Sequence, residues 1–228
     1  MYARIKTLGI VLAVLGLVFV VAGGYAFMKT QEGAKSLQAF SAAQNIKLTY
    51  NEQGQLVDRG ETAEAAAIMG LLKNDWAYPV VDGDLNPNDP LVNTPSEYMY
   101  QMATIAYHTL HSTQTVVLPE DVTAADGTVY KAGSYDFPVD GRYWTAFNRA
   151  NPIEAKAREQ AWTGTAHALI GELGVGTLTA TNLQMGLALA GLFVGIGFMQ
   201  IVTGLGLVWA ARPEKAPVPK LVTKPIPA

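Results

Sequence analysis

The sequence predicts a membrane protein, mainly α, with two transmembrane helices flanking an extracytoplasmic α+β domain with a small antiparallel sheet. Its composition is one reason, because 50% of the 228 residues are hydrophobic and only 15% are charged. The apolar residues also concentrate near the two ends, whereas the middle is polar and long enough for one modest core. Five segments follow: a cytoplasmic tip (1–7), a first transmembrane helix (8–28), an extracytoplasmic α+β domain (29–182), a second transmembrane helix (183–211) and a Pro-rich cytoplasmic tail (212–228).

Both apolar segments are long enough to cross a bilayer. No charged residue lies between Leu8 and Met28, and about 20 helical residues cross a hydrocarbon layer of roughly 30 Å. The segment from Leu183 to Ala211 is longer and also uncharged. We therefore expect the second helix to span with some tilt or to extend beyond the membrane.

The basic residues predict the orientation. Arg4 and Lys6 precede the first span, and Arg212 with several lysines follows the second. Because cytoplasmic loops are enriched in Lys and Arg, both termini are expected in the cytoplasm of a multi-pass cell-membrane protein. Lys29 and Lys35 open a long translocated segment, for which this rule has little weight.

A secretory signal is the alternative for the first span. Arg4 and Lys6 form a basic leader, and the stretch from Gly24 to Ala26 has a small residue at each end, as cleavage sites do. The apolar run is longer than in most signals, which favours an uncleaved anchor. Cleavage would leave a one-span protein with the same outside domain.

Small residues on the second span predict close helix packing. Gly191 and Gly195 form a small-xxx-small pair, Gly186 and Ala190 repeat the spacing, and Gln200 offers an interhelical hydrogen bond. This face fits a membrane-protein partner or a homo-oligomer, although glycine is also frequent in spanning helices in general. The tail after Arg212 is rich in proline and is expected to be extended or disordered.

The outside domain opens with two predicted helices. Apolar residues recur on one face between Thr62 and Trp76, which predicts a short helix. Thr94 and Glu97 form a capping box around Pro95 at the first helical position. A second helix is therefore expected from there to about His111.

Strands and a further helix follow. Residues 115–118, 128–131 and 135–139 read as strands of one small antiparallel sheet, with a turn at Asp126 and Gly127. Asn151 and Pro152 then cap a helix that is expected to carry Trp162, His167 and Glu172. We expect Gly174 and Gly176 to end this helix before the second span.

Three histidines and one carboxylate are the candidate metal ligands. His108 and His111 lie three residues apart on a predicted helix, and His167 and Glu172 lie on another. Two histidines and a carboxylate can hold iron or zinc, so a metal-dependent enzyme is chemically possible. The spacing of His108 and His111 also arises by chance, and the stretch from Tyr107 to His111 could instead be the polar end of a buried helix. No cofactor is predicted.

Several other chemistries lack the residues they need. The chain has no cysteine, so disulfides, thiolate metal sites and cysteine nucleophiles are excluded. No large basic patch is visible, so no nucleic acid is expected as a partner. The alternating Asp and Asn residues from Asp82 to Asn88 resemble a calcium loop, but Pro87 and Asn93 stand where the loop needs glycine and glutamate. A proline-rich turn with Asx caps is the better interpretation.

The whole arrangement is similar to a known family. The stretches Tyr98–His111, Phe137–Trp144 and Trp162–Gly174, between a glycine-ended first span and a glycine-rich second span, carry the likeness. The chain resembles actinobacterial two-span membrane proteins of unassigned function, often labelled aromatic ring-opening dioxygenase. That label implies an iron site, for which His108, His111 and Glu172 would be the ligands. The resemblance also implies a small exported domain tethered in the cytoplasmic membrane.

These observations favour a non-enzymatic accessory or scaffold subunit of a membrane or cell-envelope assembly. Two spans are too few for a self-contained transporter, and the cytoplasmic ends are too short for a signalling domain. The alternative is a membrane-anchored metal-dependent enzyme using His108, His111, His167 and Glu172. The lipid bilayer is the one partner that the composition itself predicts.

Overall fold

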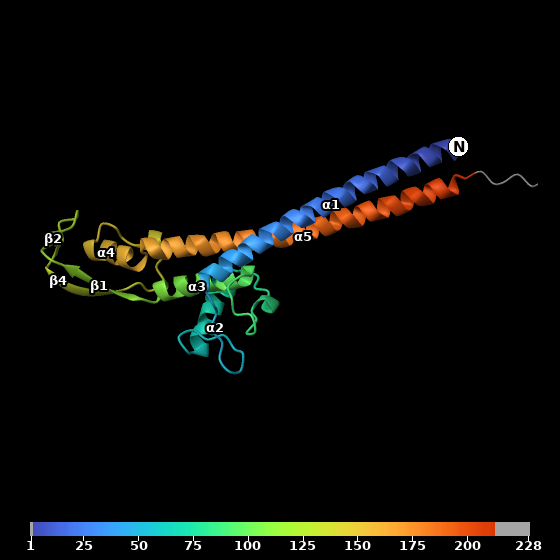
Figure 1. The fold of residues 1–228 in the computed structure, drawn as a ribbon. Helices are drawn as coiled ribbons and strands as arrows, with labels where there is room; N and C mark the ends of the chain where they lie inside the picture. Colours follow the sequence, from blue (N-terminus) through green and yellow to red (C-terminus); the bar gives the residue numbers. More distant parts are fainter. Residues whose placement is uncertain (1, 213–228) are drawn as a thin grey trace, which may run out of the picture. The chain divides into compact units, whose positions relative to one another are not determined.

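The computed structural model describes residues 2–212, so the predicted proline-rich tail from 213 onward lies outside the described residues. The chain is mainly α (Figure 1). It divides into two compact units. The hairpin unit comprises 2–31 and 185–212, and the central unit comprises 32–184. The elements in order are α1 (Tyr2–Gln44), α2 (Thr62–Gly70), η1 (Leu71–Asp75), η2 (Asp82–Asp84), α3 (Pro95–Leu110), β1 (Thr113–Leu118), β2 (Val122–Thr123), β3 (Val129–Tyr130), β4 (Gly133–Pro138), η3 (Trp144–Ala146), α4 (Pro152–Ala161) and α5 (Gly164–Ala210).

The hairpin unit consists of residues 2–31 of α1 packed against the part of α5 from 185 onward, and both helices are long and apolar enough to cross a membrane. Small residues spaced seven apart form the contact, as in a coiled coil. A Cβ atom added at Gly9, Gly16, Gly23, Gly197 or Gly204 would lie within 2.9 Å of the backbone of the partner helix, so the two backbones are in close contact. The facing pairs run in opposite directions along the two helices: Gly9 with Gly204, Gly16 with Gly197, and Gly23 with Ala190.

The capping box predicted at the start of α3 is confirmed. Thr94 Oγ1 accepts from the backbone N–H of Glu97 at 3.3 Å, and Glu97 Oε2 accepts from the backbone N–H of Thr94 at 2.9 Å. Pro95 occupies the first helical position, where its missing N–H costs nothing. The helix ends at Leu110, one residue before the predicted end.

The predicted helix from Thr62 is present, but its last turn is wound differently. The α-helical part ends at Gly70, and residues 71–75 form a π-helical turn closed by a bond from Trp76 N to Leu71 O at 3.0 Å. Ile68 and Leu72 are fully buried against α3 and anchor the core of the central unit. Each such side chain contributes about 1.5–3 kcal/mol by leaving water.

The strands form two small antiparallel sheets rather than the single sheet predicted. β1 pairs with β4, with Val116 opposite Tyr135, and β2 pairs with β3 in a separate hairpin. The hairpin turns at Asp126 and Gly127 as expected, with Gly127 at φ +84°. The prediction failed because pairing partners are chosen by long-range packing, here of α4 against β1 and β4.

The prediction that glycines end the helix before the second span was wrong. The helix capped by Asn151 stops at Ala161, and α5 begins at Gly164, with Thr163 Oγ1 accepting from Ala166 N at 3.1 Å. α5 then continues without a break through Gly174 and Gly176. A glycine inside a helix costs only about 1 kcal/mol, which packing can offset.

Packing explains Gly176 in particular. A Cβ atom there would lie 2.6 Å from Cε1 of Tyr98, so only glycine lets the Tyr98 ring approach α5 this closely. The same ring reaches α1, because its hydroxyl lies 2.7 Å from Ser41 Oγ. Tyr98 of α3 therefore joins the parts of α1 and α5 that belong to the central unit.

Candidate functional site

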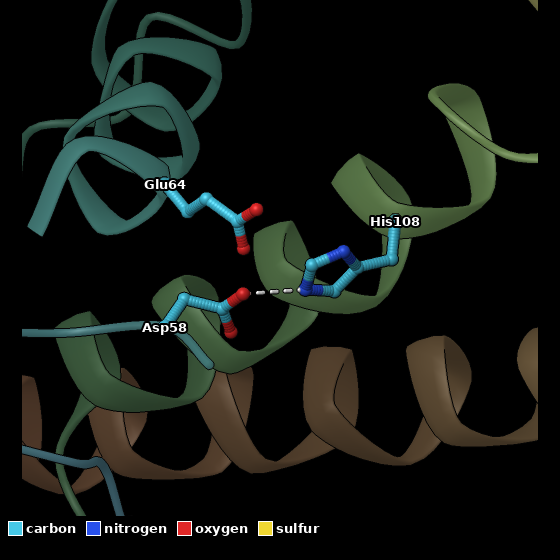
Figure 2. A group of neighbouring side chains, drawn as sticks. All are labelled: Asp58, Glu64 and His108. Carbon is cyan, nitrogen blue, oxygen red and sulfur yellow. Dashed lines mark ion pairs between the residues drawn. The ribbon is translucent and has the colours of Figure 1, made fainter. Parts of the chain in front are cut away.

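Three titratable side chains of the central unit gather between α2 and α3 (Figure 2). Asp58, Glu64 and His108 each offer one ligand atom, and these atoms lie within 4.8 Å of one another. His108 Nε2 lies 2.7 Å from Asp58 Oδ2, and the two side chains are 24% and 15% exposed. Figure 2 shows the Glu64 carboxylate directed toward this pair. We call these three residues the acid–histidine cluster.

A tight turn places the two carboxylates. Asp58 and Glu61 exchange both backbone hydrogen bonds, at 3.1 and 2.8 Å. The residues between them, Arg59 and Gly60, both have positive φ angles, of 49° and 90°, as in a type I′ turn. The chain then enters α2, where Glu64 lies in the first turn. Asp58 and Glu64 thus lie on either side of a hydrogen-bonded reversal of the chain.

His108 reaches the cluster from the last turn of α3. Tyr100 and Thr104 precede it at steps of four, so the three side chains lie on one face of the helix. Tyr100 is only 3% exposed. Burial, followed by the nearby Asp58 carboxylate, raises the pKa of the Tyr100 hydroxyl above its ordinary value. This face of α3 is therefore polar and buried at the same time.

Several buried oxygens around the cluster lack a hydrogen-bond partner within the described residues. They are Glu64 Oε2, Asp58 Oδ2, and the hydroxyls of Tyr50 and Tyr100; Asp58 Oδ2 contacts the His108 imidazole at ion-pair distance but without hydrogen-bond geometry. A buried polar atom without a partner costs about 1–3 kcal/mol. Such atoms gathered in one place need a further explanation.

An aromatic pocket of about 480 Å³ lies elsewhere in the central unit. Tyr143 stacks on Trp162 with ring centroids 5.7 Å apart, and the rings of Trp144 and His167 meet nearly at right angles with centroids 5.1 Å apart. The guanidinium of Arg158 lies 3.8 Å from the centroid of Trp144, a cation–π contact. The pocket is lined by Trp76, Met102, Ala106, Tyr143, Trp144, Thr145, Trp162, His167 and Ile170.

The predicted metal ligands His108, His111, His167 and Glu172 are not brought together. His111 is the C-cap of α3, with Nδ1 2.8 Å from Tyr107 O and its ring 4.1 Å from that of Tyr107. His167 lies in the aromatic pocket with Nδ1 3.0 Å from Thr163 O, and Glu172 Oε1 accepts from Gln44 Nε2 at 2.9 Å.

Backbone geometry explains why His111 departs from His108. The (i, i+3) rule applies inside a helix, whereas His111 at the C-cap has φ −102° and ψ 10° and has already left the helix. Of the four predicted ligands, His108 alone joins a group of three potential ligands within residues 2–212.

Sequence reasoning missed Asp58 and Glu64. They are far from His108 in the chain, and only the packing of α2 on α3 brings them to it. One signal was available: Tyr100, Thr104 and His108 put polar groups on a helix face next to fully buried Ala103 and Ala106. A polar stripe beside a core stripe indicates that another polar element packs there.

The segment compared above with a calcium loop is a set of capped turns. Asn86 Oδ1 accepts from Asn88 N at 3.0 Å, which confirms the expected Asx turn. Asp84 Oδ2 accepts from Ser96 Oγ at 2.7 Å, and Asp82 pairs with Lys73 at 3.4 Å. The carboxylate oxygens of Asp82 and Asp84 therefore stabilise η2 and the start of α3.

The residues predicted to pack the second span are divided between its faces. Gly186 and Ala190 face α1: a Cβ on Gly186 would lie 2.7 Å from Thr30 Oγ1, and Ala190 is 2% exposed. Gly191 and Gly195 have no atom within 4 Å of a built Cβ. Gln200 Oε1 is buried with no hydrogen-bond partner in the described chain.

Comparisons with protein-family models, with curated proteins and with solved structures found no match to this chain. The fold and the site give the class of protein. It is a mainly α chain with two long apolar helices packed together, flanking an α+β region with two small antiparallel sheets.

Proposed function

We propose that the protein is a non-enzymatic accessory or scaffold subunit of a membrane or cell-envelope assembly. The hairpin unit crosses the bilayer twice, both termini lie in the cytoplasm, and the central unit is displayed outside. The anchor is uncleaved, so α1 keeps its full length in the mature protein.

The exposed apolar surface of the hairpin unit carries the proposal. Only 11% of the residues in the most apolar 18-residue window of each helix are buried. Large side chains such as Val21, Phe198 and Met199 are 64%, 61% and 66% exposed. A soluble protein rarely leaves a contiguous apolar patch of more than a few hundred Å² in water. Lipid can cover such a surface without a desolvation penalty, because the surface has almost no polar groups that would lose contact with water.

The ends of the hairpin support the orientation. Because Gly9 faces Gly204, Arg4 and Lys6 at the start of α1 and Arg212 just after α5 lie at the same end of the hairpin. Basic residues are retained on the cytoplasmic side, so both tips lie there. The span residues themselves offer almost no polar chemistry, which fits an anchor better than a transport path.

A labelling experiment tests the orientation directly, because the chain has no cysteine of its own. Thr113→Cys, at an exposed position of the central unit, should react with a membrane-impermeant maleimide in intact cells. Lys215→Cys should react only after the cells are permeabilised. Labelling of Lys215→Cys in intact cells would contradict the proposed cytoplasmic position of the C-terminus. Protection of Thr113→Cys in intact cells would contradict the proposed position of the central unit outside the membrane.

The subunit role is tested by mild detergent extraction and native mass analysis of the full chain. A partner or a defined oligomer that survives gentle detergent and dissociates in harsher detergent is expected. A monomer at every detergent strength, together with correct membrane topology, would contradict the role of subunit while leaving the anchor intact.

A further inference from the structure

We propose that Asp58, Glu64 and His108 form a binding site for a divalent transition-metal cation, for which Zn²⁺ is the natural probe. The site goes beyond the anchoring and scaffold role, and it does not depend on that role.

The geometry is close to what a metal ion requires. Ligand atoms about 2.0–2.2 Å from Zn²⁺ in a tetrahedral site lie roughly 3.3 Å from one another. Here the three ligand atoms are all within 4.8 Å, with His108 Nε2 and Asp58 Oδ2 at 2.7 Å. Binding therefore requires that this pair opens by about 0.6 Å and that Glu64 moves inward by at most about 1.5 Å. Changes of side-chain rotamer supply movements of that size.

Unpartnered oxygens are an independent observation pointing to a ligand. Glu64 Oε2 is buried and has no hydrogen-bond partner among the described residues. The Tyr100 hydroxyl is buried and unpartnered too, and the Asp58 carboxylate acts on it electrostatically. A cation bound between Asp58 and Glu64 would satisfy the carboxylates, and a water on that cation could donate to the tyrosine.

A simple ion pair does not explain all of this. The His108–Asp58 contact accounts for two of the three side chains, and partly exposed pairs of this kind are common. It leaves a second carboxylate, that of Glu64, directed toward the pair, with its Oε2 receiving no hydrogen bond from the described residues. Two neighbouring ionised carboxylates repel each other, and a cation bound between them would offset that repulsion.

The donor set limits the choice of cation. One imidazole nitrogen and two carboxylates favour Zn²⁺, Mn²⁺ or Fe²⁺, because Ca²⁺ and Mg²⁺ prefer oxygen alone and Cu⁺ prefers sulfur. Three protein ligands leave a fourth position for water or for a group on a partner. Tyr100, on the His108 face of α3, offers an unpartnered hydroxyl as an outer hydrogen-bonding group.

The test uses the full chain in detergent, purified with an affinity tag that lacks histidine and stripped with a chelator. Titration with Zn²⁺ should give one equivalent bound with micromolar or tighter affinity. Co²⁺ in its place should produce the visible absorption of a four-coordinate site.

His108→Ala should weaken Zn²⁺ binding at least 100-fold, and Glu64→Gln at least 10-fold. His111→Ala and His167→Ala are matched controls that remove the remaining histidines and should leave affinity unchanged.

A stability measurement separates a metal site from a packing role, even where His108→Ala folds poorly. In the metal-free protein Glu64→Gln should leave the unfolding temperature unchanged or raise it, because it removes repulsion from Asp58. Zn²⁺ should raise the unfolding temperature of the wild type but not of Glu64→Gln. The site would be disproved by equal Zn²⁺ binding in wild type and Glu64→Gln, by loss of binding in His111→Ala instead, or by absence of binding to a folded wild type.

Discussion

Gly16 of α1 and Gly197 of α5 face each other so closely that a Cβ atom added to either would lie 2.5 Å from the carbonyl oxygen of the other. Gly9 with Gly204 repeats the contact one heptad away. Between such backbones no side chain larger than hydrogen fits. Close approach lets main-chain atoms of the two helices gain dispersion contacts along the hairpin, which is how helices associate in lipid.

A larger residue at Gly16 should therefore separate the helices. We expect Gly16→Leu to destabilise the hairpin by about 1–3 kcal/mol, as overpacking does. Gly24→Leu is the control, because a Cβ there has no atom within 4 Å. Stepwise unfolding in sodium dodecyl sulfate measures the difference. Equal stability of the two variants would show that α1 and α5 do not pack through this face.

The hairpin also predicts a specific cross-link. A Cβ built on Gly186 lies 3.6 Å from Cβ of Thr30, within the range of about 3.5–4.5 Å found in disulfides. The double variant Thr30→Cys with Gly186→Cys should therefore form an intramolecular disulfide under mild oxidation, seen as a mobility shift reversed by reductant. Thr30→Cys with Gly191→Cys should not, because Gly191 faces away from α1.

The close approach of Gly176 to Tyr98 predicts opposite effects of two neighbouring substitutions. Gly176→Ala places a Cβ 2.6 Å from the Tyr98 ring and should destabilise the central unit by about 1–3 kcal/mol. Gly174→Ala meets no atom within 4 Å and should be neutral or stabilising by up to about 1 kcal/mol, through helix propensity. Denaturant unfolding of the full chain followed by tryptophan fluorescence measures both. A stabilising Gly176→Ala would contradict the contact.

The buried carboxyl group of Glu97 predicts a pH dependence. Burial is the main cause that raises the pKa of Glu97 above its ordinary value of 4.5, against the hydrogen bonds from Asn93 and Thr94 that lower it. Between the ordinary value and the raised folded value, the folded protein binds more protons than the unfolded chain. The contribution of Glu97 to stability is therefore largest at low pH and falls as the pH rises through this window.

The variant Glu97→Gln isolates this contribution. Its unfolding free energy should fall less steeply than that of the wild type as the pH rises from about 4.5. Chemical unfolding at a series of pH values measures the two slopes. Glu52→Gln, an exposed control, should keep the wild-type slope. Parallel curves for wild type and Glu97→Gln would show that Glu97 does not titrate in this window.

Local signals were predicted well because their physical cause is local. The capping box of Thr94 and Glu97, the caps of Asn151, and the turn at Asp126 and Gly127 each depend on side chains within four residues. The two apolar helices belong to the same group, since length and composition alone define a segment that lipid can accept.

The sequence-based predictions were wrong where contacts between residues distant in the chain determine the structure. α5 runs through Gly174 and Gly176 because Tyr98, far away in the chain, packs on Gly176. β1 pairs with β4 across an inserted hairpin because α4 packs against both strands. The helix contact of α5 uses Gly197 and Gly204 rather than Gly191 and Gly195, a choice of face that depends on the opposing glycines of α1.

By itself, then, the sequence determined where the caps and turns lie and which two segments are apolar enough for a bilayer, since these follow from each residue and its near neighbours. Tertiary structure decided which glycines touch, which strands pair, and that Asp58 and Glu64 meet His108. The physical reason is that a contact between distant residues depends on the free energy of packing the whole unit. No single stretch of sequence contains enough information to determine that free energy.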